Sequence, residues 1–224
     1  MGQRRASKAA AVINSNVGSH RQMKTRDIFD EIVKGVSPFL KDNGFKKKHH
    51  TFLKSGDKDY VINFQLSKFN DGLHTDFFIN FGLHDQVIFQ TEIKNTWDCL
   101  IANRIISVKK EKDEMIVLDE NDDVKNLTTK INKAFQEQVI DFYNWHQTTE
   151  QIIEYLINET GLARYQEVYT YLFKTNQIDK VELFTRNIIN LLGPDPRIEK
   201  IANRVGDIGQ SFGHDFDFKK IVAV

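Results

Sequence analysis

The sequence predicts an α+β fold, in which an antiparallel β-meander sheet is packed by an N-terminal helix and several C-terminal helices. Apolar and polar residues alternate in two neighbouring runs, 60–67 and 77–84, and this period of two is typical of half-buried strands. Asn70-Asp71-Gly72 supplies a turn between the runs, and so short a connection joins only antiparallel neighbours. Apolar residues at helical spacing before and after the runs supply a cover for one sheet face.

Further strands are expected on both sides of this pair. Residues 51–54, followed by the turn Ser55-Gly56-Asp57-Lys58, read as a short strand and hairpin. Residues 87–89 and 115–118 are short apolar runs and are strand candidates. Residues 95–107 fit helical spacing in part and a strand in part, so both assignments stay open.

The N-terminal helix is expected to begin near Thr25. Pro38 should break or kink it near Ser37, because proline lacks the N–H that continues a helix, and Asn43-Gly44 should end it.

Several helices are expected after the sheet. The acidic run 119–123 suits the start of the first, and Thr148 with Gln151 forms a capping box that predicts another start. Apolar stripes at 162–174 and 179–192 predict an antiparallel helical hairpin.

Three parts are expected along the 224 residues. Residues 1–22 lack hydrophobic periodicity and are predicted to be a disordered basic arm, 23–158 the α+β domain, and 159–224 a C-terminal helical extension. All six charged residues up to Arg26 are basic, so the remainder has six more acidic than basic residues. A mildly acidic body argues against a nucleic-acid-binding core.

Composition also excludes several functional classes. No apolar run approaches the ~18 residues of a membrane span, so we expect no membrane partner. The single Cys99 excludes an internal disulfide and fits a reducing compartment, from which we expect a cytoplasmic location. No phosphate-binding glycine loop, nucleophile elbow or zinc signature occurs, so we expect no cofactor and no enzymatic activity.

The polar side of the predicted strands is the first candidate binding site. Asn63, Gln65 and Asn80 are uncharged hydrogen-bonding residues beside Phe78, where plain surface would carry more lysine and glutamate. Such a face would bind a partner or close over a ligand. The alternative is that helices cover both sheet faces and these amides satisfy one another.

Two further sites are candidates for partner contact. Lys46, Lys47 and Lys48 would contact an anion or an acidic partner, or else form a solvated approach to the first strand. Trp145, at a predicted helix end, would be an exposed recognition element or a half-buried aromatic.

Three residues form a weaker metal candidate. His74 and Asp76 share one face of a strand because they are two residues apart, and His84 lies further along it. With a divalent ion they would support hydrolase or nuclease chemistry. The competing interpretation is that seven histidines produce such neighbours by chance.

A set of short motifs between Thr25 and Leu156 forms a familiar series. These are Pro-Phe-Leu-Lys-x-x-Gly-Phe-Lys-Lys at 38–47, His50-Thr51-Phe52, Ile62-Asn63-Phe64-Gln65, Phe78-Ile79-Asn80-x-Gly82, Asn103-Arg104-Ile105, the acidic helix start at Asp122 and the Thr148 cap. Together they resemble the bacterial family named domain of unknown function 4304. The resemblance implies a bacterial cytoplasmic α+β domain and carries no catalytic residue or cofactor.

We therefore expect a non-enzymatic protein-binding domain, of the immunity or scaffold type found in bacterial conflict and defence. The alternatives are the metal-dependent hydrolase or nuclease and an accessory protein that binds nucleic acid through the basic arm.

Overall fold

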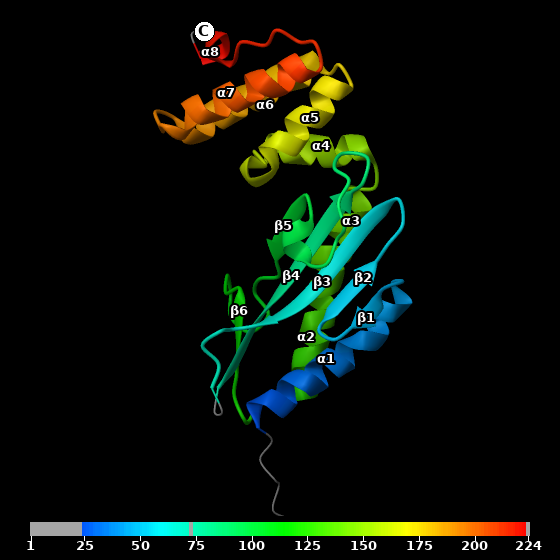
Figure 1. Cartoon of the computed structure of the whole chain (residues 1–224). Helices are drawn as coiled ribbons and strands as arrows, with labels where there is room; N and C mark the ends of the chain where they lie inside the picture. The colour runs from blue at the N-terminus through cyan, green and yellow to red at the C-terminus, as the bar shows by residue number, and fades with distance from the viewer. Residues whose placement is uncertain (1–23, 72–73, 223–224) are drawn as a thin grey trace, which may run out of the picture.

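The structure is a computed structural model that describes residues 24–71 and 74–222. The predicted arm, residues 1–22, lies outside the described residues. Within them a six-stranded sheet has the order β1-β2-β3-β4-β5, with β6 paired to β4 beside β5, and every pairing is antiparallel (Figure 1). The strands are β1 (Lys46–Lys48), β2 (Thr51–Lys54), β3 (Lys58–Leu66), β4 (Thr75–Asp85), β5 (Ile101–Arg104) and β6 (Met115–Leu118).

Helices flank the sheet on one face and at one end (Figure 1). The helical elements are α1 (Thr25–Asp42), η1 (Thr96–Asp98), α2 (Val124–Ala134), η2 (Phe135–Ile140), α3 (Asp141–Trp145), α4 (Thr149–Asn158), η3 (Leu162–Arg164), α5 (Tyr165–Lys174), α6 (Ile178–Leu192), α7 (Arg197–Ser211) and α8 (Phe218–Val222). The α+β prediction, with its antiparallel sheet, N-terminal helix and C-terminal helices, is confirmed.

One sheet face packs on α1 and on the continuous run α2-η2-α3, and we call it the core face (Figure 1). Aromatic rings take part in this contact: Phe29 of α1 lies 5.1 Å from Phe77 and 6.5 Å from Phe64, ring centre to ring centre, and Phe135 lies 6.0 Å from Phe64. All four rings are buried. Burial of a ring this size contributes about 1.5–3 kcal/mol, so this layer contributes substantially to stability.

The opposite face, which we call the outer face, is open over the half that lies away from the C-terminal helices (Figure 1). Over the other half the β4–β5 connection folds back onto the sheet. Cys99 of this connection lies so close to Gly82 that a Cβ on the glycine would stand 2.7 Å from the sulfur. Glycine is therefore required at this point of β4.

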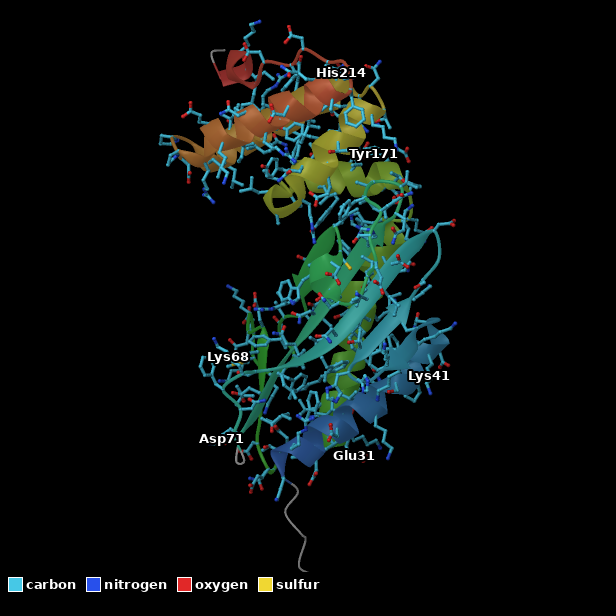
Figure 2. All side chains as sticks on the ribbon, in the orientation of Figure 1. Glu31, Lys41, Lys68, Asp71, Tyr171 and His214 are labelled. Atoms are coloured by element: carbon cyan, nitrogen blue, oxygen red, sulfur yellow. The ribbon has the colours of Figure 1, made fainter. Side chains whose placement is uncertain are left out.

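The C-terminal helices gather beyond one end of the sheet, whereas Lys68 and Asp71 mark the other end, at the β3–β4 turn (Figures 1 and 2). At the junction, the buried Asp85 carboxylate accepts from Lys58 Nζ at 2.9 Å and from the hydroxyl of Thr149, at the start of α4, at 2.7 Å. Buried apolar residues of both parts form one connected core. The boundary expected at residue 158 stays a prediction.

Local signals are confirmed at several helix ends. Thr148 and Gln151 form the expected capping box, and Asp123 accepts from Asn126 N at the start of α2. The positive φ of Gly44, 88°, follows the end of α1 as expected.

Two local expectations are corrected, and one assignment that was open is settled. Pro38 does not break α1, because it lies in the last turns and frees only the carbonyl of Lys34, which is on the exposed side. Residues 87–89 are not a strand, since the amides of Ile88 and Phe89 bond back to Asp85 O at 3.2 and 3.1 Å and close a turn. The ambiguous segment 95–107 holds the short η1 followed by β5.

The hydroxyl of Tyr143 lies 3.1 Å from the carbonyl oxygens of both Val61 and Gly82 and joins α3 to the sheet. We expect Tyr143→Phe to lower the free energy of unfolding by about 1 kcal/mol, because a buried hydrogen bond is lost. Chemical denaturation measures it. Tyr60→Phe is the control: the ring centres are 4.6 Å apart, but the Tyr60 hydroxyl has no hydrogen bond to any described residue. Equal losses in both variants would contradict the assignment.

Candidate binding face of the sheet

A row of polar side chains crosses the open half of the outer face. Strand register places Lys48, Thr51, Asn63, Asn80 and Arg104 opposite one another on β1 to β5, and we call these five residues the polar row. Residues directly opposite in antiparallel strands point to the same face, so the row is continuous.

Most of the polar row is hydrogen-bonded internally. Asn63 Nδ2 donates to Thr51 Oγ1 at 2.8 Å, and Asn80 Nδ2 donates to Gln65 Oε1 at 2.8 Å. Arg104 Nε donates to Asn80 Oδ1 at 3.1 Å. Helices leave this half of the face open, its amides satisfy one another, and binding at the face stays a prediction.

Arg104 is held on three sides. Its guanidinium carbon lies 4.4 Å from the ring centre of Phe78, and Nη1 donates to Glu114 Oε2 at 2.7 Å. Together with the bond to Asn80, which is 2% exposed, these contacts fix the guanidinium plane over the sheet.

Large apolar side chains lie at the β5–β6 end of the polar row and remain exposed. Met115 and Val117 are 39% and 48% exposed because the alternation of β6 turns them outward, while Ile116 and Leu118 enter the core. Trp97 of η1 is 57% exposed. We call Trp97, Met115 and Val117 the apolar rim.

A cavity of about 550 Å³ lies beside Arg104 at the β5 edge of this face. Asn80, Trp97, Arg104 and Glu114 line it, together with residues of β5 and Gln138 of η2. Amide, guanidinium, carboxylate and indole groups thus meet at one place.

The remaining partner candidates lie at the β1 edge of the sheet or on its other side. Lys46, Lys47 and Lys48 form the edge strand β1 and point alternately to the two faces, with Lys47 Nζ 5.6 Å from the ring centre of Phe52. Trp145 is 76% exposed but ends α3, which lies on the core face. Of the predicted binding residues, Lys46, Lys48, Asn63, Gln65, Phe78 and Asn80 share the outer face.

The metal candidate has no common centre. His74 directly precedes β4 and His84 lies near its far end, which separates them by roughly 30 Å at the rise of a strand, so they and Asp76 cannot hold one ion. Nor do any three His, Cys, Asp or Glu side chains in residues 24–71 and 74–222 form a group suited to a metal.

His84 and Cys99 are buried, and burial shifts the pKa of each. Burial lowers the pKa of His84, opposed in part by the Nε2 contact with Phe89 O at 2.7 Å and by Asp59 and Asp85, while its Nδ1 has no partner in the described structure. Burial, with the nearby Asp98, raises the pKa of Cys99 to about 12, so the thiol stays protonated.

The sequence analysis did not identify Trp97, Arg104, Glu114, Met115 or Val117 as site residues. The alternation of 115–118 was visible, but its outward positions became meaningful only once β6 was seen to pair with β4.

A comparison with protein families matches residues 36–156 to the family described as "Domain of unknown function (DUF4304)", which covers more than half of the chain. The chain belongs to this family. All six described strands, the polar row and the apolar rim lie within the matched residues. Searches of curated proteins and of solved structures gave no significant match. Among the helices of the described residues, none has the length and apolar character to cross a membrane.

Loss of the Arg104 donors should destabilise the fold. We expect Arg104→Met to lower the free energy of unfolding by about 1–2 kcal/mol, because the buried Oδ1 of Asn80 loses its donor. Arg186→Met is the control, since Arg186 makes only an exposed pair with Glu182 and should cost less than about 0.5 kcal/mol. Denaturant titration compares them, and a control as unstable as Arg104→Met would contradict the role of Arg104.

The buried His84 should make stability depend on pH. Its folded-state pKa is below the ordinary 6.5, so the unfolded chain binds more protons and stability falls as the pH drops below about 6.5. We expect His84→Gln to flatten the fall in unfolding free energy between about pH 7.5 and 5. Denaturation at several pH values measures this slope, and profiles that run parallel in variant and wild type would contradict it.

Proposed function

We propose that this protein is a non-enzymatic protein-binding domain and that the open half of the outer face is its contact surface. The observation that carries the proposal is the apolar rim, which stays exposed at one end of a hydrogen-bonded polar row while the core face is packed by helices. Exposed apolar groups clustered on one face are typical of interaction sites.

The chemistry of the face suits a protein partner. Aromatic residues, methionine and arginine are enriched in protein interfaces, and Trp97, Met115, Phe78 and Arg104 meet here. The polar row is ordered before binding, so little conformational entropy is lost when a partner covers it.

The biological setting is also a proposal. The single buried Cys99 supports a reducing compartment, the cytoplasm, and the family resemblance supports a bacterial source. A domain that neutralises or scaffolds another protein in bacterial conflict or defence needs such a contact face and no catalytic group.

Nucleic-acid binding is the second candidate, and the exposed lysines of β1 support it. Because Lys46 and Lys48 point to one face and Lys47 to the other, the three do not form a single basic stripe. Binding of labelled DNA or RNA that weakens steeply with salt would favour this candidate.

The contact surface can be tested by affinity capture from the native host with the full chain as bait. We expect Val117→Lys to deplete a captured protein at least about tenfold, because a charge replaces an apolar contact worth about 1.4 kcal/mol or more. Leu183→Lys is the matched control: Leu183 is 46% exposed, close to the 48% of Val117, but lies on α6. Equal recovery by wild type and both variants would contradict the proposal.

A further inference from the structure

The sheet has free edges at β1, β6 and β5, and these edges differ in how well their backbone groups are protected against pairing with another strand. β1 consists of three exposed lysines, which disfavour pairing with another strand. On β6 the carbonyl of Val117 already accepts from Lys109 Nζ at 2.7 Å. β5 carries no such protection over Ala102 and Arg104.

The free backbone groups of β5 follow from its register. Ile105 N donates to Ile79 O at 2.9 Å, so Ile101, Asn103 and Ile105 turn their backbone groups toward β4. The N–H and C=O groups of Ala102 and Arg104 therefore face outward, where no described residue bonds to them. Ala102 is also exposed.

Ile106, the next residue whose backbone groups face outward, shows what kind of partner such groups bond. Ile106 N donates to Gln138 Oε1 at 3.0 Å, and Gln138 Nε2 donates to Ile106 O at 2.9 Å. The side-chain carboxamide of Gln138 thus bonds the edge as the peptide group of a neighbouring strand would. It occupies one position and leaves Ala102 and Arg104 open.

A groove runs along this edge. The cavity of about 550 Å³ shares Trp97, Ala102 and Asn103 with a second cavity of about 420 Å³, which extends to Tyr155 and Arg164 near α4. β5 thus lines both cavities, and the two together follow the strand.

We infer that the partner of the proposed function adds an extended segment to β5 as a further strand, antiparallel or parallel. The segment bonds to the outward N–H and C=O groups of Ala102 and Arg104, next to the position that the Gln138 carboxamide occupies at Ile106. This inference rests on the proposed function and names how its partner is held. Two charged pairs along the groove are satisfied within the protein, Arg104 with Glu114 and Arg164 with Glu167, whereas the exposed Glu159 has no ion pair with a described residue. The segment therefore carries no acidic side chain, and an apolar side chain of it lies against the exposed indole of Trp97.

The test uses a library of random linear 12-residue peptides displayed on phage and selected on the full chain. The key variant is Ala102→Pro, which removes an outward N–H and leaves the bonds to β4 intact, as proline on an edge strand allows. Ala102→Ser keeps that N–H and is the matched control. Enriched peptides should bind wild type and Ala102→Ser alike and bind Ala102→Pro about tenfold more weakly.

Two readouts identify a strand. Methylation of alternate backbone nitrogens of the peptide should weaken binding about tenfold at every second position. In the ¹⁵N-labelled chain, the amides of Ala102 and Arg104 should exchange rapidly when free and become protected when the peptide is added.

The failures are distinguishable. No enriched peptide, or one that binds without sensitivity to Ala102→Pro and without protecting Ala102 and Arg104, overturns strand addition. If strand addition fails but Val117→Lys still depletes the captured partner, the proposed contact face is supported and only strand addition at β5 is wrong. If both amides are protected without peptide at concentrations where the chain dimerises, the edge belongs to a second copy. If they are protected in a monomer and the protection is lost when residues 1–23 are removed, the edge belongs to the chain's own N-terminal segment. Either result overturns the inference.

Discussion

The packing of the β3–β4 pair on α1 and on the α2-η2-α3 run is the constraint on which the rest of the structure depends. A strand turns successive side chains to opposite faces, so burial of Phe64 and Phe77 on the core face forces Gln65 and Phe78 to the outer face. A shift of one residue would exchange the two sets and expose the aromatic core. The stability of the core face and the polarity of the outer face therefore have one cause.

The features that could be predicted from the sequence are those that depend on one helix or strand alone. The alternation at 60–67 and 77–84, the capping box at Thr148 and the glycine after α1 each depend on neighbours a few residues away. The polar residues Asn63, Gln65 and Asn80 were found for the same reason.

The rest depends on pairings that no local pattern contains. Arg104 enters the polar row because β5 pairs with the middle of β4, and Met115 joins the apolar rim because β6 pairs beside it. Residues 87–89 have the composition of a strand, but the amides of Ile88 and Phe89 donate to the backbone carbonyl of Asp85 and form a turn. His74 and His84 seemed close in sequence, although an extended strand holds them far apart.

The junction at Asp85 has a mechanical consequence. Separation of α4 from the sheet would remove the Thr149 hydroxyl and open to solvent a carboxylate whose pairing with Lys58 depends on enclosure. Movement of α4 away from the sheet at this junction is therefore costly. Residues of β5, α4 and η3 line the cavity of about 420 Å³ together, so the same contact also restrains the shape of that cavity.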